Sequence, residues 1–419
     1  MAYTLERYAL PLVDEALRYA RVVLLLGPRQ AGKSTLLHEL ERRGSIGRTL
    51  TLDDNLTRQA ALADPTGFAA ELKRPVAIDE VQRAPDLLLA IKQIVDRDNS
   101  PGQFLLTGSA NVLTAPRILD ALTGRTDLVV LWPLAQAEIE GARSNLIDHL
   151  FDRQAPAIRD APVGPAAWFA RAIIGGFPEV RTRSPGRPRN SWFETYLASL
   201  VQRDLRELSD AQKLEEMPRL IRVLATQATG LLVPDRLSQR VGLNTRTIRS
   251  YVGLLETVFA VRVIPAWRPG IAIRERLAPK LLFADTGILA HLLGAQTDRA
   301  ANDPQIVGKL YENFVASEVS KQLVWAEHQA SLYHYRRDRE EVDLVLERAD
   351  GSIVAIEAKA SASFGASDHK SLVRLRDALG EKFRAGVILH TGPETVPLGE
   401  RLWALPVSAL WHPTETPNL

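Results

Sequence analysis

The sequence predicts an α/β protein of several domains, the first of which holds a parallel sheet. Over residues 1–140, short apolar runs alternate with helical patterns, as they do in repeated βαβ units. Apart from the threonines in residues 49–52, the runs contain no polar residue, which is typical of parallel strands that helices cover on both faces. The chain has 419 residues, whereas one domain usually has roughly 100–200. We therefore expect about two to four domains.

Each strand of the first sheet is expected where an apolar run follows a turn or a helical pattern. The expected strands are Val22–Leu26, Thr49–Leu52, Val76–Ile78, Phe104–Leu106 and Val129–Trp132. The pattern then turns helical and irregular, and Arg181–Asn190, rich in Arg, Pro and Gly, is expected to be an exposed loop. A small helical region that ends in a β-hairpin and a second α/β unit follow. The predicted domains are 1–145, 146–210, 211–290 and 300–419.

The composition narrows the class of protein. Hydrophobic residues make up 46% and charged residues 24%, as in ordinary globular proteins. The formal net charge is only +2, so any basic surface must be local. The absence of cysteine excludes disulfides, cysteine nucleophiles and thiolate metal sites, and it fits a reducing compartment. Because the first residues lack a signal-peptide pattern and no early apolar run reaches the ~20 residues of a membrane helix, we expect a cytoplasmic protein without a membrane segment.

A glycine-rich motif follows the first strand. Residues 27–34 read Gly-Pro-Arg-Gln-Ala-Gly-Lys-Ser, which matches the phosphate-binding pattern G-x-x-x-x-G-K-[ST], and a helical pattern comes next. Backbone N–H groups of such a loop wrap phosphates, and the helix N-terminus favours their negative charge. Lys33 is expected to reach the β- and γ-phosphates, and the Ser34 hydroxyl to bind Mg²⁺. The predicted ATP-binding residues are Gly27, Pro28, Arg29, Gln30, Ala31, Gly32, Lys33, Ser34 and Thr35.

Two acids follow the third strand. Asp79 is expected to hold Mg²⁺. Glu80 is expected to orient and deprotonate the water that attacks the γ-phosphate. An apolar strand that ends in two acids is common by chance, but it is much less common after a phosphate-binding motif. Because Glu follows Asp, the pattern favours ATP hydrolysis over binding alone.

The fourth strand ends in polar residues that are expected to lie between these two motifs. Thr107 and Asn111 are candidates for positioning water near the γ-phosphate, although an ordinary turn explains them equally well. An arginine can stabilise the charge that develops on the transferred phosphate. Arg125 and Arg203 are candidates, although a surface ion pair is the more common role of a single arginine. An arginine supplied by a neighbouring subunit would make the protein a homo-oligomer.

A helix-turn-helix pattern follows the irregular region. The first helix is expected at Asp235–Val241, and Asn244 is a good N-cap for a second helix at Thr245–Val258. Arg246 and Arg249 lie near the N-terminus of the second helix, which is the end that a recognition helix turns toward DNA. The alternative is a packing unit with ordinary solvated arginines.

A basic loop is expected beyond this pattern, in the manner of the wing of a winged helix. Apolar segments at Val261–Trp267 and Leu281–Phe283 flank the loop. Its positive residues are Arg268, Arg274, Arg276 and Lys280. We expect Arg268 and Arg274 to contact DNA together with the second helix.

Acidic residues recur on a helical pattern and on two successive strands near the C-terminus. Glu312 lies on the helical pattern, and Asp343 and Glu357 lie on the strands, where they can face each other and share a divalent ion. Lys359 is two residues beyond Glu357, so it shares the same face of the strand. This is the chemistry of metal-dependent phosphodiester cleavage. The alternatives are a hairpin with solvated charges and a nuclease-like fold that does not cut. The expected strands are Tyr333–Arg336, Glu341–Leu346 and Ile353–Ala358.

These motifs together resemble a family of bacterial and archaeal ATP-binding proteins with an AAA-type domain and a C-terminal domain of unknown function. The resemblance extends over nearly the whole chain. It implies an additional-strand P-loop ATPase, a winged helix and a C-terminal PD-(D/E)xK nuclease-like domain, with Glu312, Asp343, Glu357 and Lys359 at the nuclease-type positions. It rests on GPRQAGKSTLL (27–37), VAIDEVQ (76–82), LLTGSAN (105–111), LTGR (122–125), GGFPE (175–179), TRTIRSYVGLLE (245–256), KLLFADTGIL (280–289), GKLYENFVASEV (308–319), EVDLVL (341–346) and IEAKAS (356–361).

The sequence therefore predicts an ATPase that needs ATP and Mg²⁺ and acts on DNA. One alternative is a regulatory ATPase whose partner is a protein, with a C-terminal domain that only binds. A second is an ATP-coupled, structure-specific DNA nuclease.

Overall fold

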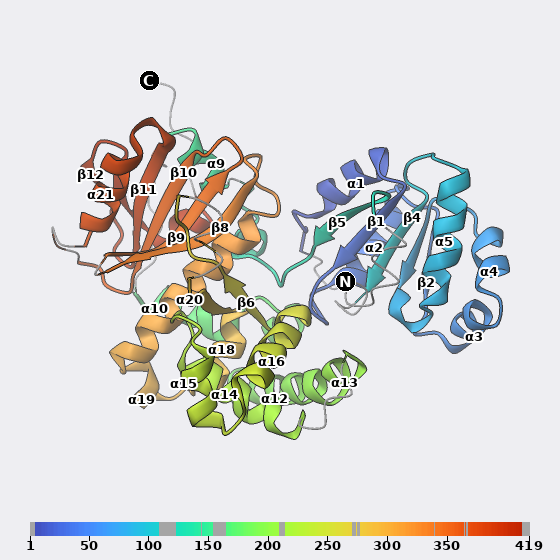
Figure 1. Ribbon diagram of the computed structural model, residues 1–419, viewed down its shortest axis with the longest axis horizontal. Helices are drawn as coiled ribbons and strands as arrows, with labels where there is room; N and C mark the ends of the chain where they lie inside the picture. Colours follow the sequence, from blue (N-terminus) through green and yellow to red (C-terminus); the bar gives the residue numbers. More distant parts are fainter. Residues whose placement is uncertain are drawn as a thin grey trace.

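The chain forms an N-terminal α/β body beside a larger body that contains the helical region and the C-terminal sheet (Figure 1). The structure is a computed structural model. It describes residues 5–108, 123–143, 145–153, 165–208, 214–269, 274, 277–338, 340–363, 365 and 368–412. No helix among these residues is long and apolar enough to cross a membrane.

The N-terminal sheet is parallel, and its strands stand in the order β2-β3-β4-β1-β5. β4 therefore separates β1, which leads into the phosphate-binding motif, from β3, which ends at Asp79. The predicted α/β class and the additional central strand are confirmed. The strands are β1 (Val22–Leu26), β2 (Arg48–Thr51), β3 (Val76–Asp79), β4 (Phe104–Gly108) and β5 (Thr126–Val130).

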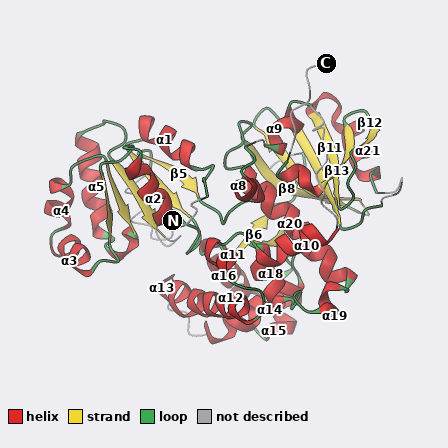
Figure 2. Cartoon of the chain, turned by 180° about the vertical axis from the view of Figure 1, so that it is seen from behind, coloured by secondary structure: helices red, strands yellow, loops and turns green. Residues whose placement is uncertain are grey.

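Helices cover both faces of this sheet, as the unbroken apolar strands predicted (Figure 2). Alternate strand residues point to opposite faces, so Val22 and Leu24 pack against α3, α4 and α5, whereas Val23 and Leu25 pack against α1 and α2. The helices are α1 (Leu10–Tyr19), α2 (Lys33–Arg42), α3 (Asn55–Ala63), α4 (Pro65–Glu71) and α5 (Asp86–Arg97), with a 3₁₀ turn at Val81–Arg83.

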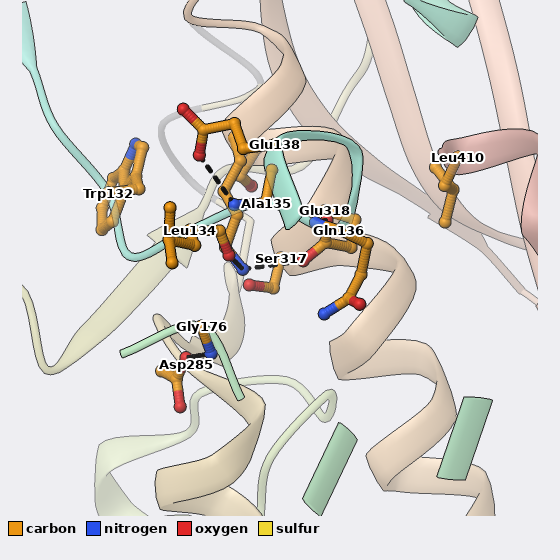
Figure 3. A network of polar contacts seen from close by, with 12 residues as sticks. Trp132, Leu134, Ala135, Gln136, Glu138, Gly176, Asp285, Ser317, Glu318 and Leu410 are labelled. Atoms are coloured by element: carbon orange, nitrogen blue, oxygen red, sulfur yellow. Dashed lines mark hydrogen bonds and ion pairs between the residues drawn. The ribbon is translucent and has the colours of Figure 1, made fainter. Parts of the chain in front are cut away.

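A buried polar network fixes the segment that leads from β5 into the larger body (Figure 3). The Leu134 N–H donates to the Gly176 carbonyl at 2.8 Å, and the Lys321 ammonium donates to the Leu134 carbonyl at 3.0 Å. The Gln136 N–H donates to the Glu318 carboxylate at 2.7 Å. The connection between the two bodies is therefore held by hydrogen bonds from elements far away in the sequence.

The middle of the chain is helical, as predicted, but its basic segment is not a loop. Arg181 lies in α11, and α12 begins at Arg187. The helices before the helix-turn-helix are α8 (Gln136–Glu140), α9 (Leu146–Phe151), α10 (Pro165–Ile174), α11 (Pro178–Thr182), α12 (Arg187–Ser199), a π-helix η2 (Leu200–Asp204), α13 (Leu205–Leu208), a 3₁₀ turn at Leu214–Glu216 and α14 (Met217–Thr226).

The helix-turn-helix pattern forms two helices joined by a short turn, α15 (Pro234–Val241) and α16 (Thr245–Thr257). The Asn244 side chain caps α16, because it accepts a hydrogen bond from the Thr247 N–H at 2.8 Å. The antiparallel strands β6 (Val261–Ile264) and β7 (Lys280–Phe283) follow, and then the helices α18 (Thr286–Leu292) and α19 (Asp298–Ala301).

The C-terminal sheet is mixed, with strand order β12-β13-β11-β10-β9-β8. The long helix α20 (Pro304–Gln322) covers one face and α21 (Lys370–Leu379) the other. Asp343 on β9 and Glu357 on β10 stand opposite each other, since β9 and β10 are antiparallel with Leu344 beside Ile356. The strands are β8 (Ala330–Arg337), β9 (Glu340–Arg348), β10 (Ile353–Lys359), β11 (Phe383–His390), β12 (Val396–Gly399) and β13 (Leu402–Pro406), with 3₁₀ turns at Gly380–Lys382 and Val407–Leu410.

The hydrophobic cores divide the chain differently from the four predicted domains. Two cores lie within the N-terminal body, one on each face of its sheet. A single core runs from Leu146 through the middle helices to Trp411, and it joins the residues of α14, α16 and α20 to one face of the C-terminal sheet. The middle and C-terminal regions therefore share a continuous interior.

Candidate nucleotide-binding site

The phosphate-binding loop has the backbone that its glycines permit. Gly27 has a φ of +154°, and a Cβ there would lie 2.1 Å from the Leu131 carbonyl oxygen, so no other residue fits. Gly32 has a φ of +99° and is the N-cap of α2. Lys33 begins α2, and its buried ammonium donates to the carbonyls of Gly27 and Pro28 at 2.9 and 3.0 Å. Burial lowers the pKa of Lys33.

Side chains from three elements meet beside this loop. The Ser34 hydroxyl donates to one carboxylate oxygen of Asp79 at 2.7 Å, and the Thr107 hydroxyl donates to the other oxygen. This contact exists because β4 lies between β1 and β3, as the sequence predicted. The arrangement gathers two hydroxyls and a carboxylate at the carboxyl edge of the sheet, which is where ligands bind in parallel α/β sheets.

Glu80 lies one residue beyond Asp79, in a left-handed backbone conformation with a φ of +59°. Its N–H donates to the Thr107 hydroxyl at 3.3 Å, and its carboxylate accepts from the Gln82 side chain. Non-glycine residues with this φ concentrate where function requires a strained backbone. The strain turns Glu80 away from the line of the strand, and Glu80 lines the same cavity as Lys33 and Ser34.

A cavity of about 990 Å³ separates the loop from the helical region. Arg29 of the loop spans it, with its Nε 2.5 Å from an Asp204 oxygen at the end of the π-helix η2. π-helical turns occur often at functional sites. The other residues that line the cavity from the helical region include Pro178, Glu179, Arg181, Thr182, Arg183, Trp192, Thr195, Tyr196, Ser199 and Leu200.

Arg181 lines this cavity, although the sequence did not predict it as a site residue. Its side chain is half-buried, and no hydrogen bond or ion pair holds it within the described part of the chain. Burial, and then the nearby charge of Arg171, lower its pKa. A half-buried cation in the wall of the cavity is suited to an anionic ligand. Neighbouring Arg183 is instead paired with Glu179 at 3.1 Å.

The other candidates for phosphate chemistry lie elsewhere. Arg125 precedes β5 and so stands at the edge of the sheet opposite to the loop, where it pairs with Asp96. It cannot reach the nucleotide site of its own chain, so the prediction of a role in the same chain is wrong. Arg203 is exposed on η2. Asn111 lies outside the described residues.

Comparisons with known proteins agree with this geometry. Residues 19–140 match the AAA domain family, and this range includes the loop, Asp79 and Thr107. The N-terminal domain is of the AAA type. Residues 166–299 and 307–410 match two domains of unknown function, DUF8612 and DUF4143. The match supports nucleotide binding by the AAA domain.

Whole-chain relatives exist, but their names describe no activity. Uncharacterized proteins from Mycobacterium bovis and Mycobacterium tuberculosis are each 29% identical over 409 residues, which is 97% of this chain and 84% of theirs. A Walker-type ATPase of Pyrococcus abyssi is 17% identical with a TM-score of 0.43, and the match covers 69% of this chain and 96% of that one. AMPPCP-bound DnaA from Aquifex aeolicus is 14% identical with a TM-score of 0.28, and the match covers 59% of this chain and 85% of that one.

The residues predicted to contact DNA fall into two groups. Arg246 and Arg249 are exposed on the first turns of α16. Arg268 and Arg274 are engaged by the C-terminal sheet: Arg274 pairs with Glu347 at 2.5 Å and lies over the Tyr333 ring, and Arg268 lies over the Tyr335 ring. The expected free basic wing is therefore wrong, because the segment after β6 packs along β8. Arg276 lies outside the described residues.

The acidic residues of the C-terminal region come together, but Lys359 does not join them. Glu357 and Asp343 share a hydrogen bond. Burial, and then the nearby charge of Asp343, raise the pKa of Glu312 on α20. The Lys359 ammonium is 3.4 Å from Asp368 instead. Within the described residues, no cluster of three or more His, Cys, Asp or Glu side chains has the arrangement of a metal site.

Proposed function

We propose that the protein is a Mg²⁺-dependent ATPase. The observation that carries the proposal is the contact of Ser34, Asp79 and Thr107 beside Lys33, at the mouth of a cavity large enough for a nucleotide. The Ser34 hydroxyl and the Asp79 carboxylate are hard oxygen ligands of the kind that Mg²⁺ prefers, and their 2.7 Å contact shows that both reach one point. Bound there, the ion would neutralise charge on the β- and γ-phosphates.

Different residues carry out the separate parts of the proposed reaction. The N–H groups of the loop and the Lys33 ammonium bind the phosphates. Glu80 accepts a proton from the attacking water, and Thr107 fixes the position of Glu80 through the Glu80 N–H. Arg181 lines the cavity from α11, and we propose that it stabilises the charge that develops during transfer.

Replacing Arg181 with alanine is expected to lower kcat for ATP hydrolysis about 10²-fold, which is the size of effect that follows loss of one donor to developing charge. KM should change little, because the contribution is made in the transition state. Steady-state hydrolysis across ATP concentrations measures both constants. Arg183→Ala is the matched control, since Arg183 lines the same cavity but is paired with Glu179, and it should stay near wild type. An unchanged kcat in Arg181→Ala removes Arg181 from the mechanism.

Arg181 also bears on self-association. The expectation of a homo-oligomer depended on an arginine from a neighbouring subunit, whereas Arg181 offers the same charge within one chain. Arg125 keeps only the role of an arginine supplied to a neighbour, and its pairing with Asp96 would have to open for that role. We therefore propose that a monomer can turn over ATP.

We further propose that the ATPase acts on DNA through α16. The supporting observation is that Arg246 and Arg249 are exposed at the N-terminal end of a capped helix, which is the end that enters a groove in helix-turn-helix proteins. Arg268 and Arg274 are left out of this surface because they contact β8 and β9. The basic footprint is thus small, so a protein partner remains the second candidate.

Duplex DNA is expected to raise ATP turnover, and the double variant Arg246→Ala/Arg249→Ala should lose that response. DNA affinity should fall, and the slope of log affinity against log salt concentration should shrink by about 1 for each arginine. The measurement is ATP hydrolysis with duplex, single-stranded and branched DNA, together with binding at several salt concentrations. Arg219→Ala/Arg222→Ala removes two exposed arginines at the same spacing from α14 and serves as the control. Turnover that ignores every DNA would favour the protein partner.

A further inference from the structure

A buried ammonium group lies among the acidic residues of the C-terminal region. Lys280 is the first residue of β7 and only 1% exposed. Its Nζ lies 2.6 Å from a Glu312 oxygen, 3.1 Å from an Asp343 oxygen and 3.6 Å from a Glu341 oxygen. The prediction that Lys280 belongs to a basic loop is wrong, because the residue is buried at the start of β7. Strand β7 instead carries the side chain under α20 and against β9.

We infer that the Lys280 ammonium is a built-in cation that takes the place of a divalent metal ion between Glu312 and Asp343. The three residues come from β7, α20 and β9, so the ammonium joins the helical region to the C-terminal sheet at this point. As a consequence, these C-terminal acids do not support metal-dependent cleavage. This inference concerns a different site from the nucleotide cavity and stands apart from the proposed ATPase activity.

The ammonium already occupies the point where the acidic side chains meet. Its Nζ donates to Glu312 and to Asp343, and a Glu341 oxygen lies 3.6 Å away. The carboxylates that a divalent ion would need are therefore hydrogen-bonded to a cation of the chain itself.

A metal ion at this point would need the space and the oxygen atoms that the ammonium already uses. Mg²⁺ takes about six oxygen ligands at about 2.1 Å, so it would have to occupy the volume that the Lys280 Nζ fills. One Asp343 oxygen is committed to Lys280, and the other accepts from the Ala358 N–H at 2.9 Å. Lys359, expected to act beside the metal, is paired with Asp368. The ammonium therefore competes with a metal for the very oxygens that a metal needs.

The test compares wild type with Lys280→Ala in the absence of nucleotide. Removing the ammonium leaves a buried carboxylate without a counterion, so Tm should fall by about 5–15 °C. Millimolar Mn²⁺ should restore much of this loss in Lys280→Ala, and Lys280→Ala/Asp343→Asn should show no such rescue. Lys370→Ala, which removes an exposed lysine from α21, is the control and should respond to Mn²⁺ as wild type does.

If Lys280→Ala does not fold, measurements on the wild-type chain test the inference. In calorimetric titration with Mn²⁺, wild type and Asp343→Asn should give the same heat of binding. Mg²⁺-dependent nicking of DNA by the wild type should be absent. Mn²⁺ binding or nicking that depends on Asp343 in the wild type would overturn the inference. A folded Lys280→Ala that ignores Mn²⁺ would overturn it as well, because the cluster would then have no affinity for a cation beyond its own lysine.

Discussion

Replacing Lys33 with alanine is expected to abolish detectable ATP hydrolysis and to weaken ATP binding by about 10²-fold or more, as expected for loss of a buried charge that contacts phosphates. The Lys33 side chain is 6% exposed, whereas Arg29, the other cation of the loop, is paired with Asp204, so we expect no other side chain to replace Lys33. Its contacts with the carbonyls of Gly27 and Pro28 hold it across the loop, ready for the phosphates. Binding of a fluorescent ATP analogue and steady-state hydrolysis together measure the effect.

The control for this experiment is Lys73→Ala, which removes an exposed lysine from the same domain. Lys33→Arg is a sharper comparison, because it keeps the charge but not the compact ammonium that fits between the two carbonyls. If Lys33→Ala hydrolyses ATP at more than a few per cent of the wild-type rate, the loop is not the catalytic phosphate site.

Replacing Glu80 with glutamine is expected to slow hydrolysis about 10²–10⁴-fold, the range for loss of a general base. ATP binding should be retained, because the amide is nearly the same size and Glu80 is not expected to contact the phosphates. This outcome separates Glu80 from Lys33, whose loss affects both steps. A single-turnover measurement with saturating enzyme isolates the chemical step from product release.

Asp53→Asn is a suitable control for Glu80→Gln, since it removes one negative charge from an exposed carboxylate near the same edge of the sheet, where it pairs with Arg83. Retention of normal turnover in Glu80→Gln would mean that Asp79 or another group activates the water. Loss of ATP binding in the same variant would show instead that Glu80 shapes the pocket.

The parts of the site that follow strands could be predicted from the sequence. The loop at 27–34, Asp79 and Thr107 each come directly after an apolar run, and parallel strands bring their carboxyl ends to one edge. Arg181 could not be predicted in this way. It lies about 150 residues beyond Lys33 in a segment rich in Arg, Pro and Gly, and only the tertiary fold brings α11 to the wall of the cavity.

The C-terminal acids show a different limit of sequence reasoning. The antiparallel register of β9 and β10 placed Asp343 beside Glu357 as expected, because alternation along a strand is regular. The lysine that pairs with these acids differs from the predicted one. Lys359 shares a strand face with Glu357, so local spacing favours it. Lys280 comes from another region and reaches Asp343 through tertiary packing, whereas Lys359 pairs with Asp368. Local spacing cannot reveal which of two lysines is buried.

The segment between the two bodies is held in place by hydrogen bonds and an ion pair. Arg7 donates to the Ala31 carbonyl in the phosphate-binding loop and to the Trp132 carbonyl just after β5, both at 2.6 Å, and it pairs with Glu138 at 3.0 Å. Between these residues, the Lys321 ammonium donates to the Leu134 carbonyl. Glu318 of α20 accepts a hydrogen bond from the Gln136 N–H (Figure 3). A continuous series of hydrogen bonds therefore joins the phosphate-binding loop to α20, the same helix that carries Glu312 against the C-terminal sheet.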